Sequence, residues 1–404
     1  MRILLINDYG TPNGGAELLM FALRDGLRQR GYDARLFSTS AQDGEGNRLS
    51  DYDCLGTTSS FRTLLQSYNP WAAKRLKQVL REFQPHIVHI KIFLTQLSPS
   101  ILSLLQTVPS LYYVAWYRPV CPVGNKILPD GSACHDRYGK ACYRNGCLPL
   151  HDWLPLMVQM RQWRRQRHVF NRIVANSRAT EQRLAEEKIT TDAVIECGVP
   201  VRSPRAPLTS LPTIVFAGRL VREKGIDVLL KAFAQVVKAV PKARLLIAGE
   251  GPERDRLQAL IQEIDLVGTV SLLGHLPRDS MEQYFDQAWV QAVPSRWAEP
   301  FGMVAAEAMM RGTAVVATGS GGLVDIVQHE HTGFLVPPED VDQLAKALLL
   351  LLKDRALAEK FGQAGRKIAL AKFGETTFVD RFVDHYEALL GESTCVDRRK
   401  AHVF

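Results

Sequence analysis

Two acidic and two basic side chains in the second half of the sequence have the types and spacing needed to bind a charged small molecule. Glu299 and Glu307 are the ends of the segment EPFGMVAAE, and Arg219 and Lys224 lie in the segment GRLVREKG, residues 218–225. Arginine can contact a phosphate with two parallel hydrogen bonds and lysine contacts it as a point charge, so this pair can bracket an anion. The alternative for the basic segment is a solvated loop.

The apolar surroundings of Glu307 also indicate a ligand. Glu299 could serve only to cap a helix, but Glu307 stands on a predicted helix whose other residues are nearly all apolar. A carboxylate there needs polar partners, such as the hydroxyl groups of a ligand. Gly302, between the two, allows the backbone to approach that ligand closely.

A pair of glycines, Gly14 and Gly15, follows the first apolar run and opens a predicted helix. Backbone N–H groups at such a helix start can bind phosphate, and simple chain reversal is the alternative. The pair matches neither the dinucleotide-binding nor the P-loop pattern.

Four cysteines within 27 positions form a possible metal site, with 12, 7 and 4 residues between them: Cys121, Cys134, Cys142 and Cys147. Four thiols can hold a structural zinc ion that stabilises a loop without a core. Free thiols or a disulfide are the alternatives, because the usual CxxC pairs are missing. The Asp-x-Asp triplets at 51–53 and 340–342 are interpreted as chance, so no catalytic metal is expected.

A basic segment follows the cysteines and carries five arginines between 161 and 172, near Trp153 and Trp163. Arginines and tryptophans on one helix suit an anionic membrane surface, and a solvated charged face is the alternative. Nucleic acid is not expected as a partner, because no recognition module is visible.

The elements that must position these residues alternate between strand and helix. Strands are predicted at 2–7, 34–39, 87–90, 110–115, 173–177, 193–197, 213–217, 244–248, 270–273, 290–293, 314–317 and 333–336. Helices are predicted at 16–30, 226–240, 253–264, 303–311 and 340–352. Four prolines between 200 and 212 favour a linker. We therefore predict an α/β fold of two doubly wound parallel-sheet domains that face each other across a cleft.

Composition and charge limit the class of protein. The 404 residues are 46% hydrophobic and 23% charged, as in a globular protein, and the net charge of +8 favours anionic partners. The longest apolar run, 347–352, is too short to span a bilayer, and the N-terminus turns polar at Asn7 before a signal-peptide core could form. Seven cysteines are too few for a disulfide scaffold, so the reducing cytoplasm is the expected location.

Taken together, these motifs resemble the retaining glycosyltransferases of family 4, which have the GT-B fold. The similarity extends over nearly the whole chain and rests on the GRL…EKG loop, the GEGP turn at 249–252, the two glutamates with seven residues between them and the GG-x-x-D-I-V…TGFLV stretch. It implies transfer of a sugar from a UDP-, GDP- or ADP-sugar to the hydroxyl of a glycan, lipid-linked or small-molecule acceptor. It also implies that catalysis needs no metal ion or other cofactor.

The resemblance implies roles for individual residues. Arg219 and Lys224 would hold the donor diphosphate, Glu307 the nucleotide ribose and Glu299 the donor sugar, so that Glu299, Arg219 and Lys224 form the catalytic set. The other donor contacts that it implies are Gly14, Gly15, Gly218, Glu250, Gly251, His275, Leu276, Phe301, Gly302, Met303 and Val304.

Two positions depart from the family. The histidine that contacts the donor sugar in many members falls on Ala115, and the Asn-Gly of the interdomain junction is Cys197-Gly198. Two alternatives therefore stay open: a non-catalytic subunit that binds a nucleotide sugar, and a hydrolase, epimerase or synthase of the same fold.

The resemblance divides the chain into three parts. Residues 1–200 would bind the acceptor and carry the cysteine insertion at about 116–150, and residues 201–375 would bind the donor. Residues 376–404 would form a helix that crosses back to the first domain, plus a tail. The chain is expected in the cytoplasm, on the inner face of the cell membrane if the basic helix binds lipid.

Overall fold

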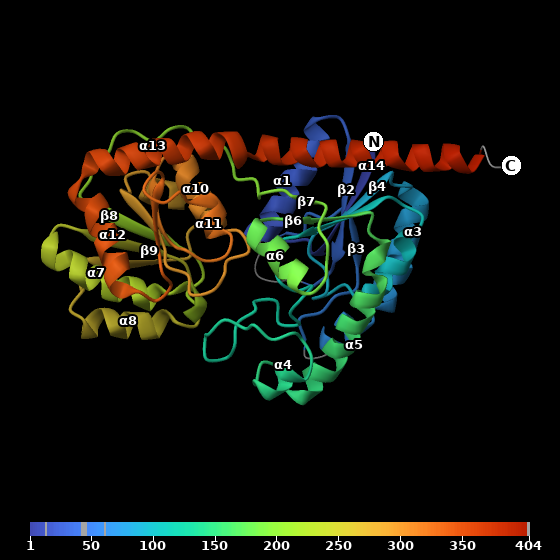
Figure 1. The fold of residues 1–404 in the computed structure, drawn as a ribbon, viewed down its shortest axis with the longest axis horizontal. Coiled ribbons are helices and arrows are strands. Elements are labelled where there is room, and N and C mark those ends of the chain that lie inside the picture. The colour runs from blue at the N-terminus through green and yellow to red at the C-terminus, as the bar shows by residue number, and fades with distance from the viewer. Residues whose placement is uncertain (13, 42–46, 60–61, 402–404) are drawn as a thin grey trace. The chain divides into compact units, whose positions relative to one another are not determined.

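The computed structural model describes residues 1–12, 14–41, 47–59 and 62–401, and the chain forms two compact units (Figure 1). The first unit contains residues 1–129, 134–198 and 375–404, and the second contains residues 130–133 and 199–374. The chain thus enters the second unit after Gly198 and leaves it after Gly374. The predicted tail at 402–404 lies outside the described residues.

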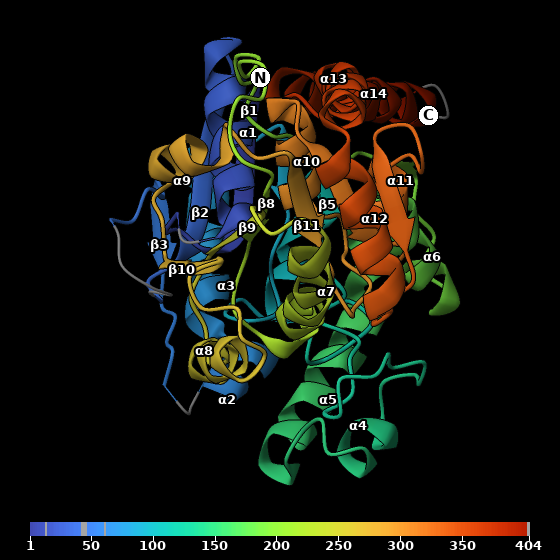
Figure 2. The same ribbon diagram turned by 90° about the vertical axis from the view of Figure 1, so that its left-hand side faces the viewer.

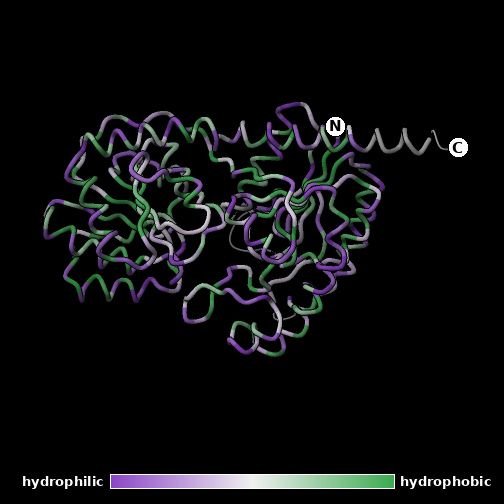
Figure 3. The backbone as a smooth tube through the Cα atoms, in the orientation of Figure 1, coloured by the Kyte–Doolittle hydropathy of each residue, from purple (hydrophilic) through white to green (hydrophobic). Residues whose placement is uncertain are grey.

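The first unit is built on a sheet of seven parallel strands in the order β3-β2-β1-β4-β5-β6-β7. These strands are β1 (Arg2–Tyr9), β2 (Asp33–Thr39), β3 (Tyr52–Cys54), β4 (Ile87–Ile90), β5 (Ser110–Val114), β6 (Arg172–Ala175) and β7 (Ala193–Val194). The helices are α1 (Gly15–Gln29), α2 (Arg62–Ser67), α3 (Pro70–Phe83), α4 (Lys140–Arg144), α5 (Leu150–Gln166), α6 (Arg178–Glu186) and α14 (Glu375–Ala401), with 3₁₀ turns at Pro99–Leu105 and Arg167–Val169. The central strands are buried on both faces, and for this reason apolar residues predominate in their sequences (Figure 3).

The second unit has a sheet of six parallel strands in the order β10-β9-β8-β11-β12-β13. These strands are β8 (Thr213–Ala217), β9 (Arg244–Ala248), β10 (Val270–Gly274), β11 (Val290–Val293), β12 (Ala314–Thr318) and β13 (Gly333–Val336). The helices are α7 (Ile226–Ala239), α8 (Arg254–Glu263), α9 (Arg278–Phe285), α10 (Met303–Arg311), α11 (Leu323–Ile326), α12 (Val341–Lys353) and α13 (Arg355–Lys372), with a 3₁₀ turn at Arg222–Lys224. Helices α7 and α12 lie side by side (Figure 2). Their apolar sides, with Phe233 and Leu348, join strand residues such as Ile247 in the main core of this unit.

The predicted α/β fold with two parallel sheets is confirmed, and every predicted strand is present. Strand β3 was missed, because three residues are too few to show a pattern.

The two Asp-x-Asp triplets have structural roles. Asp51 accepts hydrogen bonds from the Arg28 guanidinium at 2.8 and 2.9 Å, and Asp340 caps α12 by accepting a bond from Gln343 N at 2.9 Å.

The last helix, α14, belongs to the first unit, where it lies against α1 (Figure 1), and one of its sides is buried. Phe378, Phe382 and Tyr386 recur every four residues along that side and are buried. His89 of β4 lies among them, with its Nδ1 2.5 Å from the Tyr386 hydroxyl and its ring centroid 4.7 Å from that of Phe382. Burial, together with the charge of Lys91, lowers the pKa of His89 to about 3. The imidazole is therefore neutral.

Candidate active site

The order of strands in the second sheet indicates where a ligand binds. The order reverses between β8 and β11, and in open α/β sheets ligands bind outside the carboxyl ends of the strands at such a point. The loop after β8 contains Arg219 and Lys224, and the loop after β11 contains Glu299. The fold thus brings the predicted cations and the predicted carboxylate to one edge of one sheet.

Lys224 and Glu299 form an ion pair at this edge. Lys224 Nζ lies 2.6 Å from Glu299 Oε1, and Ser295 Oγ donates to the same oxygen at 2.7 Å. The Glu299 side chain is 8% exposed and that of Lys224 is 20% exposed. Burial acts to raise the pKa of Glu299, but the charge of Lys224 and the hydrogen bonds from Lys224 and Ser295 prevail, so the pKa is lowered. Glu299 is therefore a carboxylate held against a cation.

The loops after β8 and β11 are fixed to each other by Arg296. Its guanidinium donates to Asp227 at 2.6 and 2.9 Å and to Glu339 at 2.8 Å, and its backbone N–H donates to Glu223 O at 2.8 Å. Sequence analysis missed this network and Ser295, because Arg296 and Asp227 are 69 positions apart and neither belongs to a recognisable motif. Gly225 allows the two loops to approach each other this closely, because a Cβ at this position would lie only 2.0 Å from Pro294 O.

Glu299 leads into helix α10 through a turn that requires glycine. Gly302 precedes the helix with φ of +111°, and a Cβ on it would lie 2.5 Å from Leu323 Cδ2. The N–H of Gly322 donates to Glu299 O at 2.7 Å, so the glycine-rich segment after β12 packs on this turn. Phe301 is buried, whereas Met303 and Val304 in the first turn of α10 are partly exposed. Glu307, one turn further along α10, is also partly exposed.

The remaining donor contacts that the family implies lie along the same edge of the sheet. The loops after β8 and β9 are joined by Leu220 N, which donates to Glu250 O at 2.8 Å, and Gly218 N donates to Ala248 O at 3.0 Å. Gly251 follows in the same turn. His275 is exposed, and Leu276 packs on a small cluster beside the sheet.

Two predicted contacts at this edge have side chains on the surface. Arg219 is 77% exposed and lies 4.0 Å from Glu223, and Glu250 pairs with Arg254 at 2.8 Å. The pairing of Arg219 and Lys224 around an anion stays a prediction.

The first sheet has its own reversal point, between β1 and β4. Gly14 and Gly15 lie beyond β1, where they begin α1 as its N-cap and first residue. Asp8, at the end of β1, accepts bonds from the backbone of Thr95, Gln96 and Leu97 at 2.8, 3.1 and 2.7 Å, and from the Thr95 hydroxyl. Burial exceeds the effect of these bonds and raises the pKa of Asp8 to about 6.

The two tryptophans near the basic segment at 161–172 differ from the prediction, which grouped them with the arginines on a surface. Trp163 is buried, with Nε1 donating to Pro119 O at 3.0 Å, and Trp153 Nε1 donates to Gly139 O at 2.8 Å. Trp163 therefore belongs to the interior of the first unit, whereas Trp153 is partly exposed. Arg161, Arg164 and Arg165 on α5 are exposed. No helix among the described residues combines the length and the apolarity needed to cross a membrane.

Two protein families match the chain, one in each half. Residues 13–203 match the family described as Glycosyltransferase Family 4, and residues 203–368 match Glycosyl transferases group 1. Over 191 residues, 47% of this chain, it is 37% identical to an exopolysaccharide phosphotransferase of Streptomyces coelicolor, of which the match covers 19%. Over 186 residues, 45% of this chain, it is 34% identical to a GDP-mannose-dependent alpha-(1-6)-phosphatidylinositol monomannoside mannosyltransferase of Mycobacterium tuberculosis, of which the match covers 48%. The match spans less than half the length of either relative.

Solved structures with the same fold cover nearly the whole chain. Sucrose-phosphate synthase from Thermosynechococcus elongatus has a TM-score of 0.74 and 24% identity over 97% of this chain and 100% of that one. Anabaena HepE in complex with UDP and glucose has a TM-score of 0.69 and 20% identity over 96% of this chain and 99% of that one. At these identities the likeness shows a shared fold.

Proposed function

The chain belongs to the GT-B glycosyltransferases, and from this premise we propose that it transfers a sugar from a nucleotide-diphosphate sugar to an acceptor hydroxyl with retention of configuration. The observation that carries the proposal is the ion pair between Lys224 and Glu299 at the reversal point of the second sheet. It supplies a cation and an ionised carboxylate where a sheet of this kind binds its ligand.

Each part of the site has a role in this reaction. Lys224 and the more exposed Arg219 would hold the leaving diphosphate, and the first N–H groups of α10 would add the positive end of a helix. Glu299 would accept hydrogen bonds from the donor sugar, and Glu307 from the ribose. The bond between the anomeric carbon and the diphosphate oxygen breaks, the acceptor oxygen bonds to that carbon from the same face, and the acceptor proton passes to the departing phosphate. This scheme needs neither a protein base nor a metal ion.

Two similar proteins support a nucleotide-diphosphate sugar as the donor. One relative is GDP-mannose-dependent, and the HepE complex contains UDP and glucose. We therefore propose a UDP-, GDP- or ADP-sugar as donor. A thermal-shift comparison of the three would identify it, because a ligand that binds only the folded state raises the melting temperature.

Substitution of the two cations tests the assignment of the diphosphate site. Lys224→Ala and Arg219→Ala should each raise the donor KM and lower kcat, with a loss on the order of 2–4 kcal/mol in kcat/KM, because each removes a charged contact to the leaving group. Steady-state kinetics with the identified donor measures this loss. Lys231→Ala, which removes an exposed cation of α7, is the matched control and should leave kcat/KM unchanged. Normal turnover in both test variants would disprove the assignment.

The stereochemistry of the product tests the same-face route. Inversion needs a base on the face opposite the leaving group, and Ala115, at the family's histidine position, cannot accept a proton. An α-linked donor should therefore give an α-linked product. Proton NMR of the new linkage decides the question, and a β-linked product formed directly from an α-linked donor would exclude retention.

Ala115 also favours a second candidate function, a subunit that binds the nucleotide sugar without turning it over. The two functions differ in one measurement. A binding subunit would show a thermal shift with the donor but release no nucleotide with any acceptor offered, whereas an enzyme would release it.

An exposed surface on α5 supports attachment to an anionic membrane. Leu150, Leu154 and Val158, four residues apart on one side of the helix, are 52%, 55% and 51% exposed. Arg161 and Arg165 continue the same side and are exposed. Apolar residues next to arginines suit the boundary between acyl chains and anionic headgroups. We propose that this surface brings the chain to a membrane and to a lipid-linked acceptor.

Vesicle sedimentation tests this attachment. The chain should bind vesicles containing phosphatidylglycerol more than vesicles of phosphatidylcholine, and added salt should weaken the binding. Leu154→Gln/Val158→Gln should abolish it, and the control Leu350→Gln, at an exposed leucine of α12, should not. Equal binding to both lipids, or binding that survives the double substitution, would contradict the proposal.

A further inference from the structure

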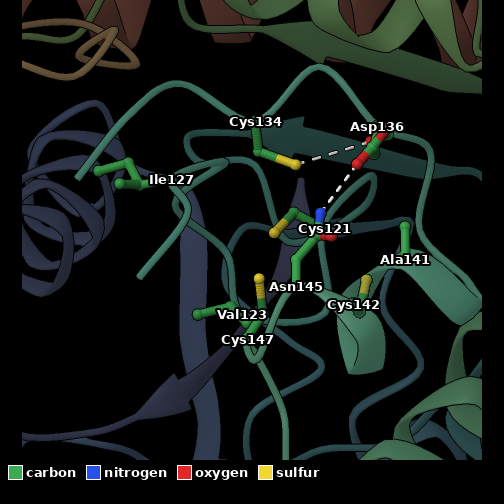
Figure 4. A pocket seen from close by; sticks show the side chains of 9 residues that line it. All are labelled: Cys121, Val123, Ile127, Cys134, Asp136, Ala141, Cys142, Asn145 and Cys147. Atoms are coloured by element: carbon green, nitrogen blue, oxygen red, sulfur yellow. Dashed lines mark hydrogen bonds between the residues drawn. The ribbon is translucent and has the colours of Figure 1, made fainter. Parts of the chain in front are cut away.

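A cavity of about 20 Å³ in the first unit is lined by all four cysteines of the insertion (Figure 4). This space holds one particle of the size of a water molecule or an ion. Cys121 follows β5, Cys134 and Cys147 lie in the irregular stretches beyond it, and Cys142 lies on α4. The fold thus gathers residues from along this segment around one point.

The segment has no apolar core that would hold it in place. None of residues 127–150 is buried, and α4, with five residues, is the helix that lies within this range. A stretch of this length without buried side chains needs another source of order, such as a metal ion or a covalent link.

The four thiols are free cysteines and are not joined in disulfides. Burial first, and then the charges of the neighbouring cysteines, raise the pKa of Cys142 and of Cys147. Among the described residues, no group of three or more His, Cys, Asp or Glu side chains is arranged so that it could hold a metal ion as it stands.

The donor set around the cavity consists of sulfur atoms. The one carboxylate nearby, Asp136, is engaged by Asn145 Nδ2 at 2.9 Å, and the Cys134 thiol donates to the Asp136 carbonyl oxygen at 3.9 Å (Figure 4). The N–H of Gly124 points to Cys121 Sγ at 3.4 Å, and such a bond supports a thiolate ligand. Four thiolates are a set that selects zinc over magnesium or calcium.

We propose that Cys121, Cys134, Cys142 and Cys147 bind one Zn²⁺, which fixes the segment at 121–147. Each thiol gives up its proton when the ion binds, and the four sulfur atoms close around it at about 2.3 Å. The role is structural and separate from sugar transfer, so it can be tested without an activity assay.

Elemental analysis of the full chain, purified without a metal-chelating column, tests the proposal. We expect about one zinc per chain, and after replacement by cobalt the charge-transfer absorption of a tetrahedral thiolate site. Four titratable thiols in metal-free protein, or a mass that reveals disulfides among these cysteines, would overturn the proposal.

Substitutions show whether the zinc lies at these cysteines. Cys142→Ser and Cys147→Ser, which change partly exposed residues, should each lose most of the bound zinc. Cys54→Ser is the control, since it changes a buried cysteine of β3 outside the cavity, and it should keep the zinc. If the test variants do not fold, removal of the metal from the unmodified chain by a chelator should make the segment at 127–150 sensitive to protease. Zinc retained by both test variants, or unchanged proteolysis after chelation, would overturn the site.

Discussion

The pairing of Lys224 with Glu299 determines the charge state of the carboxylate at the proposed donor site. Burial alone would favour the protonated acid, and Lys224 and Ser295 reverse this preference. The ammonium group of Lys224 also lies 5.6 Å from the centroid of the Trp297 ring. The side chain that would contact the phosphate thus also keeps Glu299 ionised.

Removing the cation should change how stability depends on pH. In the wild type the pKa of Glu299 is lowered, so its contribution to stability is present above the ordinary glutamate pKa and is lost as pH falls through the folded-state value. In Lys224→Met burial remains and the cation is gone, so we expect that pKa to lie above its ordinary value. The variant should be less stable by about 3 kcal/mol at pH 7, with the difference shrinking as pH falls towards 4.

Urea unfolding between pH 4 and 8 measures this difference. Glu299→Gln in the Lys224→Met background should recover part of the loss, because no uncompensated charge is then buried. A difference between wild type and Lys224→Met that stays constant with pH would show that Glu299 does not titrate as argued.

At this scale the sequence predicted which residues of its motifs lie at strand ends, and their roles in sugar transfer stay predictions. Lys224 and Glu299 were predicted because each stands in a recognisable segment next to a strand end. Ser295 and Arg296 were not, because their roles depend on partners that the fold brings near. Ser295 adds a hydrogen bond to Glu299, and Arg296 binds Asp227 of α7, Glu339 after β13 and the backbone of Glu223 in the loop after β8.

Among the elements, α14 makes a specific side-chain contact with its sheet through Tyr386 and His89. His89 and Tyr386 form one polar contact inside an otherwise aromatic cluster. Because the pKa of His89 is about 3 when folded and near 6.5 when unfolded, the unfolded chain takes up the proton first as pH falls. The contact should therefore make the docking of α14 sensitive to acid.

Replacing both partners should remove this sensitivity. The wild type should lose up to about 5 kcal/mol of unfolding free energy between pH 6.5 and pH 3. The double variant His89→Leu/Tyr386→Phe should not show this loss, and its stability at pH 8 should be little changed. Urea unfolding across this range, with far-UV circular dichroism as the signal, measures the effect. His331→Leu, at an exposed histidine of the second unit, should keep the wild-type profile. An unchanged profile in the double variant would mean that His89 is not the group that titrates.

Elements were predictable where the sequence pattern reflects burial. Strand β8, for example, is an almost wholly apolar run because both faces of a parallel sheet are covered, and its predicted bounds match the structure. Strand β3 and helix α11 are too short to produce a periodic pattern. Trp163 was assigned to the surface because its neighbours are arginines, but its place on α5 turns it into the core.

At the scale of the molecule, the two units differ in how the chain builds them. The second unit is nearly continuous, residues 199–374, with 130–133 as its other part, whereas the first unit needs α14 from the far end of the chain. A fragment of residues 199–374 should therefore fold on its own and unfold cooperatively. Residues 1–198 should not, because the side of the sheet that contains His89 would lack Phe378, Phe382 and Tyr386.

Denaturant unfolding of the two fragments checks this difference. Fragment 199–374 should give one sigmoidal transition, and fragment 1–198 should bind a dye for exposed apolar surface and unfold without a sharp transition. A stable, cooperative fragment 1–198 would show that α14 is not needed by its unit.

The return of the chain through α14 also sets the order in which a newly synthesised molecule becomes native. Strand β1 is synthesised before residues 199–374, yet the helix that completes its sheet is synthesised after all of them. At about 5–20 residues per second, the apolar side around His89 and Tyr113 waits on the order of ten seconds or more for Phe378 and Phe382, while the second unit can already fold. A nascent chain at this stage exposes the kind of apolar surface that chaperones bind. A chain truncated before residue 375 would lack the helix that completes the first unit.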